Sequence, residues 1–189
     1  DIRAYLNGLF FELNKDSLTV VATDGHRLSI GEVSQESSLE EKKTVILPRK
    51  AVLELTKLLN KSTQSIAEIH LSDNYFSLID SSTKIISRLI DGNFPNYKQV
   101  MPTDFSNTIM SDRVDFLSSL QKASIFVDER TKGVKLVFRD DKLSIFSHSE
   151  RGRAETQLEV TKQEKELEIA FNIHYLISIL EKLTTTKVN

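Results

Sequence analysis

Apolar residues recur at every second position along two stretches of the chain, and the two stretches share one arrangement. The alternation runs over 9–13, a polar segment follows at 14–17, and the alternation resumes over 18–22. The same order of alternation, polar segment and alternation recurs over 134–147. Period-two patterns separated by a short polar segment predict β-hairpins that turn one face to a core.

Each predicted hairpin is followed by a strand-like run and an amphipathic helix. The runs lie at 45–48 and 169–172, where Pro48 suits the first helical position and Asn172 suits an N-cap. The apolar faces of the two helices are predicted to contain Val52, Leu55 and Leu59, and Leu176, Ile179 and Leu183, respectively.

The two copies keep a nearly constant spacing. Gly8 and Gly133, which begin the hairpins, are 125 residues apart (133 − 8), and the helix residues Val52 and Leu176 are 124 apart (176 − 52). A spacing held through strands, turn and helix indicates an internal repeat, and therefore two related α+β domains in tandem. We expect these domains at 1–102 and 103–189.

The copies are expected to begin and end at different points of the repeat. A further amphipathic helix is predicted over 111–126, and the first copy begins after the place of such a helix. The predicted cap of this helix is Ser111 or Asp112, and its apolar residues are Val114, Leu117, Leu120, Ala123 and Ile125. The first copy continues into strands at 66–71, 75–79 and 84–90, and the second is expected to lack these last strands.

Composition and charge narrow the classes of function. The chain has no cysteine, which excludes disulfides and thiolate metal sites. Its net charge is −2, so nucleic-acid binding would need a local basic face. No apolar run approaches the roughly 20 residues of a membrane-spanning helix, and neither spaced metal ligands nor a phosphate-binding loop occur. We expect no cofactor, no metal, no membrane contact and a cytoplasmic location.

The run Ala-Thr-Asp-Gly-His-Arg-Leu at 22–28 places polar groups at the end of the first hairpin. Gly25 can take a positive φ and so form a tight turn. Asp24 and His26 could form the acid–base pair of a small hydrolase, because an aspartate can orient an imidazole. A structural turn is favoured, since no nucleophile motif is present and the second copy changes the spacing at 147–151. A generic β-rich interaction scaffold is the remaining alternative.

Lysine and arginine gather on the polar faces of the predicted helices. They are Arg49, Lys50, Lys57 and Lys61 on the first helix of the chain, and Arg113 and Lys122 on the helix over 111–126. Such faces are either ordinarily solvated or meet a polyanion through phosphate contacts that do not depend on base sequence.

Four strings resemble the bacterial DNA polymerase III β-subunit family, the sliding clamps. They are Tyr5-Leu6-Asn7-Gly8, Ala22-Thr23-Asp24-Gly25-His26-Arg27-Leu28, Pro48-Arg49-Lys50 and Asp91-Gly92-x-Phe94-Pro95-x-Tyr97, and their order and separations also match. The resemblance covers essentially the whole chain. It implies part of the middle clamp domain followed by most of the third.

Membership would imply a fold and a function. Antiparallel sheets would lie on the outside and helices would line the inner, DNA-facing side. In the family, a homodimeric ring encircles duplex DNA and acts as a non-catalytic processivity factor. It tethers the replicative polymerase, the clamp loader and repair proteins through short peptide motifs. This chain alone is not expected to close a ring.

The resemblance also implies two sets of site residues and no catalytic residue. A peptide-binding pocket between the middle and third domains would contain Leu6, Thr23, Gly25, His26, Arg27, Leu28, Pro95, Val100, Asn172 and Tyr175. The DNA-facing residues would be Arg3, Tyr5, Arg49, Lys50, Lys57, Lys61, Arg113 and Lys122. Gln99 stands where some members have arginine.

Overall fold

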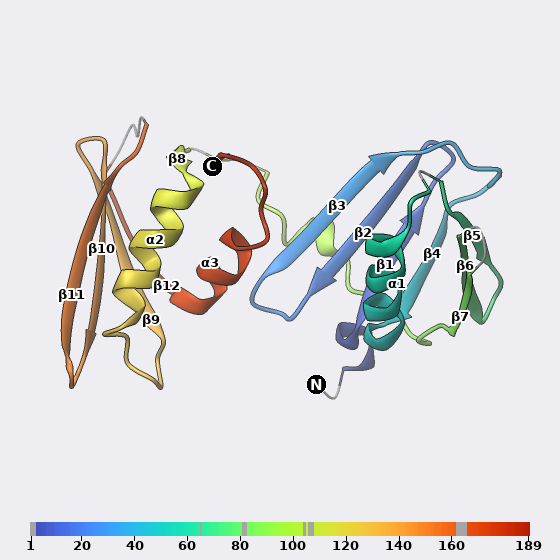
Figure 1. Ribbon diagram of the computed structural model, residues 1–189, viewed down its shortest axis with the longest axis horizontal. Coiled ribbons are helices and arrows are strands. Elements are labelled where there is room, and N and C mark those ends of the chain that lie inside the picture. The colour runs from blue at the N-terminus through green and yellow to red at the C-terminus, as the bar shows by residue number, and fades with distance from the viewer. Residues whose placement is uncertain (1–2, 65, 81–82, 104, 106–107, 162–165) are drawn as a thin grey trace. The chain divides into compact units, whose positions relative to one another are not determined.

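The computed structural model describes residues 3–64, 66–80, 83–103, 105, 108–161 and 166–189 (Figure 1). The chain divides into two compact units, Asp1–Met101 and Pro102–Asn189. The expected domain join lies one residue beyond this division. Each unit is described by itself.

The described residues of the first unit form two antiparallel sheets and one α-helix. The larger sheet has the strand order β3-β2-β1-β4, and the smaller has the order β5-β6-β7. The elements in chain order are η1 (Ala4–Asn7), β1 (Gly8–Leu13), β2 (Ser17–Thr23), β3 (Leu28–Ser34), β4 (Lys43–Pro48), α1 (Arg49–Lys61), β5 (Glu68–Leu71), β6 (Tyr75–Asp80), β7 (Thr83–Arg88) and η2 (Tyr97–Gln99).

The core of the first unit lies where α1 meets both sheets. Leu55 of α1, Phe11 of β1 and Phe76 of β6 are buried there, and the rings of Phe11 and Phe76 are 5.5 Å apart. The alternation predicted over 9–13 therefore turns its odd-numbered residues to this core. Each fully buried side chain of this size stabilises the fold by about 2 kcal/mol relative to exposure.

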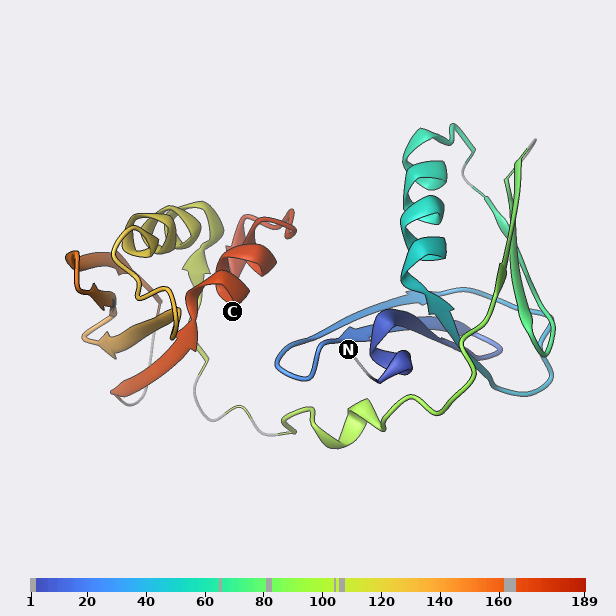
Figure 2. The ribbon, with the colours of Figure 1, turned by 90° about the horizontal axis from the view of Figure 1, so that it is seen from below.

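The opposite face of the larger sheet is also buried, which the alternation did not predict. Val21 of β2 pairs with Phe10 of β1, which pairs in turn with Ile46 of β4, and Val21 and Ile46 are almost fully buried. Figure 2 shows the segment 89–100 passing over this face, on the side of the sheet away from α1. The larger sheet is therefore covered on both sides along this row, whereas its edge strand β3 is mostly exposed.

In the second unit, the residues that the structure describes form a four-stranded antiparallel sheet, a short two-stranded sheet and two α-helices. The larger sheet has the order β11-β10-β9-β12, and β13 pairs with β8. The elements are β8 (Ser111–Asp112), α2 (Arg113–Ser124), β9 (Gly133–Arg139), β10 (Lys142–Ser149), β11 (Gly152–Glu159), β12 (Leu167–Asn172), α3 (Ile173–Leu180) and β13 (Lys187–Val188). Figure 1 shows both helices on one face of the larger sheet.

Strand pairing confirms the internal repeat. Leu13 pairs with Leu18 in the first unit, and Phe138 pairs with Leu143 in the second, so both partners are shifted by 125 (138 − 13, 143 − 18). The larger sheets have equivalent strand orders, and one edge strand of each, β4 or β12, runs directly into a helix. The two units are therefore copies of one hairpin, strand and helix arrangement.

The helices α1 and α3 begin differently, because only α3 has a side chain that caps its first turn. Asn172 accepts a hydrogen bond from the backbone N–H of His174 at 3.0 Å, as expected of an N-cap. The prediction that Pro48 is the first helical residue is wrong. Its backbone is extended (φ −60°, ψ 144°) because it still pairs with Gly8 as the last residue of β4, and α1 begins at Arg49.

The helix predicted over 111–126 is shorter and is capped by Asp112, whose carboxylate accepts from the backbone N–H groups of Val114 and Asp115. Five residues assigned to apolar helix faces are exposed, because they lie on the solvent side of a helix or, for Ile125 and Leu183, beyond the end of one. Those exposed are Leu59, Val114, Ile125, Ile179 and Leu183. Leu120 and Ala123 of α2 are fully buried as predicted.

Among the residues that the structure describes, no helix has the length and apolar character needed to cross a membrane.

Candidate functional site

A pocket of about 480 Å³ lies within the first unit, at the end of the β2–β3 hairpin. Three parts of the chain form it: the N-terminal segment with η1, the hairpin loop, and the segment around η2. Its lining residues are Arg3, Tyr5, Leu6, Thr23, Gly25, His26, Arg27, Leu28, Pro95, Asn96, Tyr97 and Val100. Eight of the ten residues expected to bind a peptide are therefore brought together.

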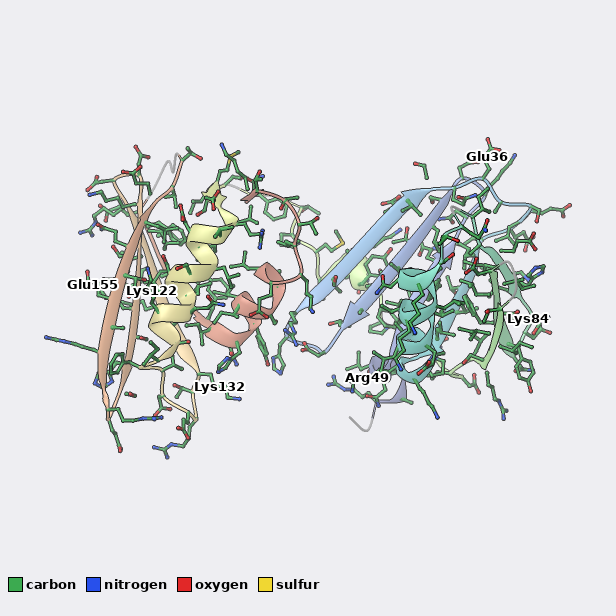
Figure 3. The ribbon with its side chains drawn as sticks, viewed as in Figure 1. Glu36, Arg49, Lys84, Lys122, Lys132 and Glu155 are labelled. Atoms are coloured by element: carbon green, nitrogen blue, oxygen red, sulfur yellow. The ribbon has the colours of Figure 1, made fainter. Side chains whose placement is uncertain are left out.

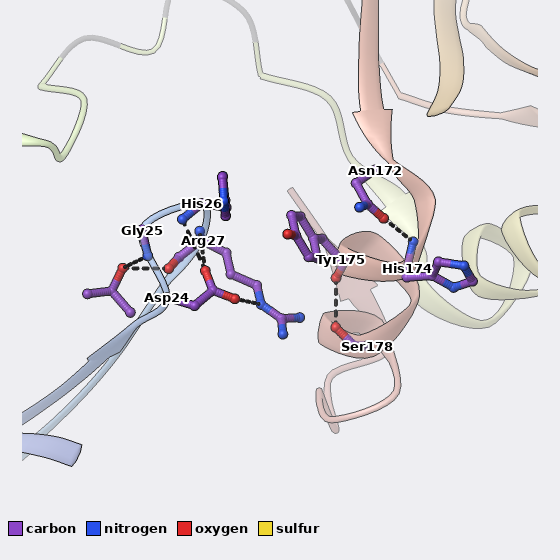
Figure 4. A network of polar contacts seen from close by, with 9 residues as sticks. Asp24, Gly25, His26, Arg27, Asn172, His174, Tyr175 and Ser178 are labelled. Atoms are coloured by element: carbon purple, nitrogen blue, oxygen red, sulfur yellow. Dashed lines mark hydrogen bonds and ion pairs between the residues drawn. The ribbon is translucent and has the colours of Figure 1, made fainter. Parts of the chain in front are cut away.

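The hairpin loop is held rigidly by its own polar groups (Figure 4). The Thr23 hydroxyl donates to the carbonyl of Arg27 at 2.8 Å and accepts from the N–H of Gly25 at 3.1 Å. One Asp24 carboxylate oxygen accepts from the N–H groups of His26 and Arg27 at 3.0 and 3.1 Å. Gly25 has φ +87°, the left-handed conformation that the sequence predicted.

The Asp24 carboxylate acts as a structural acceptor. Its second oxygen accepts from the Arg27 guanidinium at 2.9 Å. Partial burial acts to raise the pKa of Asp24, but the N–H of His26 and the Arg27 side chain outweigh it, so this pKa lies below its usual range. The carboxylate is therefore ionised at neutral pH and occupied by the turn itself. This geometry disfavours Asp24 as the acid–base partner of a hydrolase.

The N-terminal segment forms the wall beside the loop. The guanidinium nitrogens of Arg3 lie 3.7 and 3.9 Å from the point that a Cβ on Gly25 would occupy. Leu6 adds an apolar surface from η1, and Leu28 adds another from the start of β3. The pocket therefore combines aliphatic side chains with cationic groups at its border.

The segment around η2 forms the other wall. The ring of Phe94 stacks on Phe10 of β1, with centroids 4.7 Å apart, and the ring of Tyr97 meets Phe10 edge-on at 6.1 Å. Tyr97 is buried, whereas Pro95 and Val100 are exposed. The aromatic residues of the Phe-Pro-x-Tyr string thus fix this segment on the outer face of the sheet.

A buried carboxylate also contacts this wall. Glu12 of β1 is 6% exposed, and its oxygens lie 2.7 Å from the Lys42 ammonium and 3.5 Å from the Lys98 ammonium. Burial acts to raise the pKa of Glu12, but the two lysines outweigh it, so this pKa is lowered overall. Lys98 belongs to η2, so the pair joins the wall to the sheet.

The remaining two residues expected in the pocket belong to the second unit. Asn172 caps α3, and the carbonyl of Tyr175 accepts from the Ser178 hydroxyl at 3.0 Å (Figure 4). Their place in a peptide site stays a prediction. Asn96 and Tyr97 line the pocket without having been assigned to it, although the Phe-Pro-x-Tyr string was a signal for both.

The residues expected to face DNA fall into three groups. Arg3 and Tyr5 line the pocket, so they lie beside the expected peptide site. The basic residues of α1 are exposed; they are Arg49, Lys50, Lys57 and Lys61, with Arg49 labelled at the start of α1 in Figure 3. Lys57 also pairs with Glu54 at 2.9 Å.

The two expected DNA-facing residues of α2 differ from each other. Lys122 is exposed (Figure 3). Arg113 is half-buried, and its guanidinium donates to the carbonyls of Thr185 at 2.8 Å and Leu180 at 3.2 Å. Arg113 therefore satisfies carbonyls at and beyond the end of α3.

Within the described ranges, no group of three or more His, Asp or Glu side chains could hold a metal ion.

Comparison with known proteins extends the resemblance found in the sequence. Residues 1–96 match the family described as the DNA polymerase III beta subunit, central domain, and residues 98–189 match the C-terminal domain of the same subunit. The "Beta sliding clamp" of Haemophilus influenzae is 35% identical over 189 residues, which are all of this chain and 51% of that protein. The chain thus spans about half the length of the curated relatives it matches.

Solved structures agree with these matches. The crystal structure of the DNA polymerase III subunit beta from Pseudomonas aeruginosa has a TM-score of 0.94 at 31% identity, covering 99% of this chain and 52% of that one. A sliding clamp from the same organism bound to griselimycin has a TM-score of 0.92 at 31% identity, covering 99% and 51%. Both halves of the chain match successive domains of one subunit, and the chain belongs to the DNA polymerase III β-subunit family, the beta sliding clamps.

Proposed function

We propose that this chain serves as part of a DNA sliding clamp and binds partner proteins through the pocket of the first unit. The observation that carries the proposal is the convergence of three separate segments on one pocket, with a rigid hairpin loop and an aromatic-anchored wall. Aliphatic surfaces with a few fixed polar groups suit the apolar side chains of a short peptide. The replicative polymerase, the clamp loader and repair proteins are the partners we expect.

The charges around the pocket define the partner further. Arg3 and Arg27 are among its lining residues, Arg27 being paired with Asp24 as well, and none of the described lining residues is a carboxylate. A peptide whose apolar side chains are accompanied by an acidic residue would therefore be favoured over one with lysine at that position. The role of the protein is tethering, without catalysis.

The basic face of α1 supports the second part of the proposal. Four exposed cations on one helix suit contacts with the phosphates of duplex DNA, which carry no sequence information and weaken with salt. We expect the full-length protein to form a ring of two subunits on DNA in the bacterial cytoplasm.

Griselimycin is a suitable probe for the pocket, because a related clamp has been solved with it. Titrated into the 189-residue chain, it should bind, and Leu28→Ala should weaken binding at least about tenfold because an apolar wall is lost. Leu53→Ala removes an exposed leucine from α1 and serves as the control that leaves affinity unchanged. Equal affinity in wild type and Leu28→Ala would contradict the assignment of the pocket.

The DNA part is tested in the full-length protein. Replacing Arg49, Lys50 and Lys57 by alanine should reduce retention on circular duplex DNA and lower its salt dependence, because three phosphate contacts are removed. The same number of substitutions at Lys84, Lys132 and Lys142, which lie outside the helices, provides the control. Unchanged retention at low salt after the α1 substitutions would count against the proposal.

A further inference from the structure

We propose that the ion pair between Glu12 and Lys98 positions the η2 wall of the pocket and thereby sets the affinity of the pocket for its ligands. This inference rests on the proposed function of the pocket. Both residues act as positioning residues, because neither is among the residues that line the pocket.

The segment 89–100, which forms the η2 wall, needs side-chain contacts to hold it because it contains little regular structure. Among the described residues of 89–100, η2 is the one helical element, and no strand of the unit includes them. The segment is tied to the sheet at its start, where the N–H of Ile90 donates to the carbonyl of Ile46 at 2.9 Å. Beyond that point, the Phe10 ring contacts and the Lys98 ion pair hold it.

Glu12 is suited to this role by its burial. A carboxylate that is 6% exposed is costly unless it is paired, so the sheet favours any arrangement that keeps an ammonium group beside it. Two segments provide one ammonium each: Lys42 from the loop before β4, and Lys98 from η2. The Lys98 ammonium also lies 5.8 Å from the centre of the Tyr97 ring.

The backbone hydrogen bonds of η2 link Lys98 to its neighbours that line the pocket. The N–H of Gln99 donates to the carbonyl of Asn96 at 3.1 Å, and that of Val100 donates to the carbonyl of Tyr97 at 3.2 Å. This single turn therefore moves as one piece, with lining residues on both sides of Lys98. Loss of the ion pair leaves the wall less organised before binding, and ligand binding must then order it.

The experiment compares the two lysines that share Glu12. Griselimycin is titrated into the 189-residue chain carrying Lys98→Ala, Lys42→Ala or Lys98→Arg. We expect Lys98→Ala to weaken binding about threefold, the size of a partly exposed ion pair. Lys98→Arg should restore it. Lys42→Ala should change it less than about 1.5-fold, although it removes an equal charge and the other ammonium partner of Glu12.

A double variant separates positioning from direct contact. If Lys98 acts through Glu12, Glu12→Gln weakens binding, and the Glu12→Gln/Lys98→Ala variant is no weaker than the worse of the two single variants. Losses that multiply, or equal losses in Lys42→Ala and Lys98→Ala, would overturn the inference. The proposed function fails separately: in that case wild-type protein does not bind griselimycin, or binds it independently of Leu28.

Discussion

The larger sheets of the two units pair their strands in the same register, yet their outer faces carry different residues. In the first unit the row Val21, Phe10 and Ile46 is apolar and lies under the segment 89–100. The corresponding row of the second unit is Phe146, Lys135 and Ala170, of which Lys135 and Ala170 are exposed. The Lys135 ammonium on β9 also lies 3.0 Å from the Glu168 carboxylate on the neighbouring strand β12.

The hairpin loops differ in the same way. The loop Asp24–Arg27 corresponds to 149–152, but the second hairpin continues pairing to Ser149 and Gly152 and so turns within two residues. Arg153 occupies the place of Leu28 (28 + 125), so an arginine stands where the first unit has an apolar wall residue. The nearby hollow of about 380 Å³ is lined by charged groups of both signs, which include Asp128, Lys132 and Arg151.

This comparison separates the scaffold from the function. The repeat supplies the sheet and the helix that follows it in both units. The pocket lies where the loop chemistry of the first unit departs from the repeat, beside the segment 89–100 that covers the outer face. Exchanging residues between equivalent positions therefore tests which differences matter.

The largest loss of affinity is expected when Leu28, which lines the pocket, is replaced by arginine, the residue at the equivalent position 153 of the second unit. Leu28→Arg should weaken griselimycin binding about a hundredfold, because it replaces an apolar wall with a third arginine. Isothermal titration calorimetry measures the change. The matched variant Arg153→Leu alters the equivalent place in the second unit and should leave affinity unaltered. An equal loss in both variants would remove the distinction between the two loops.

A second exchange tests the outer face. Phe10→Lys introduces the residue found at position 135 and removes both ring contacts with the η2 wall. The first unit should lose about 2 to 3 kcal/mol of unfolding free energy, as large apolar losses usually cost. Urea unfolding provides the measurement. Lys135→Ala should change stability by less than about 0.5 kcal/mol, and a similar loss in the two variants would show that segment 89–100 is not anchored by Phe10.

Much of this architecture follows from the sequence. The spacing of 125 residues identified the repeat because strand alternation, turn and helix recur together. The outer row was missed because Val21 and Ile46 are covered by a segment that is some 45 to 70 residues away in the chain (91 − 46, 91 − 21). Likewise, nothing local in the sequence indicates that Lys98 reaches Glu12, or that Arg113 bonds carbonyls near the end of α3.

The sequence predicts some pocket residues better than others, again because local patterns can be read from it and distant contacts cannot. Thr23, Gly25 and Leu28 belong to a contiguous string whose turn chemistry is local, so the sequence could place them together. Tyr97 was harder to assign, because its ring is buried against the sheet while it also lines the pocket.

A smaller loss of stability is expected from a substitution that tests the backbone conformation of the hairpin loop. Gly25→Ala should destabilise the first unit by about 1 kcal/mol, because an L-residue is disfavoured at positive φ. Its Cβ would meet no atom closer than 3.7 Å, so the cost comes from the backbone and not from a clash. Gly133→Ala, where φ is not positive and the nearest atom is 3.6 Å away, should cost less. Thermal unfolding of both variants compares them, and equal costs would refute the strained-loop account.

The smallest effect is a pH dependence carried by Glu12. Its pKa is lowered in the folded state, so its contribution to stability is present above the unfolded pKa of about 4.5 and is lost as the pH falls through the folded pKa. Wild-type protein should therefore lose stability between pH 5 and 3 more steeply than Glu12→Gln. Urea unfolding at several pH values checks this, and parallel curves would indicate that Glu12 is not held ionised by its lysines.

The most direct test of the central claim is a residue-by-residue map of ligand binding. Amide resonances of the isotopically labelled chain are recorded while griselimycin is added. The pocket account predicts that Gly25, Leu28 and Val100 shift in proportion to occupancy, whereas Gly152 and Arg153 at the equivalent hairpin do not. Shifts at the second hairpin with none at the first, or no shift at Leu28 on saturation, would contradict it.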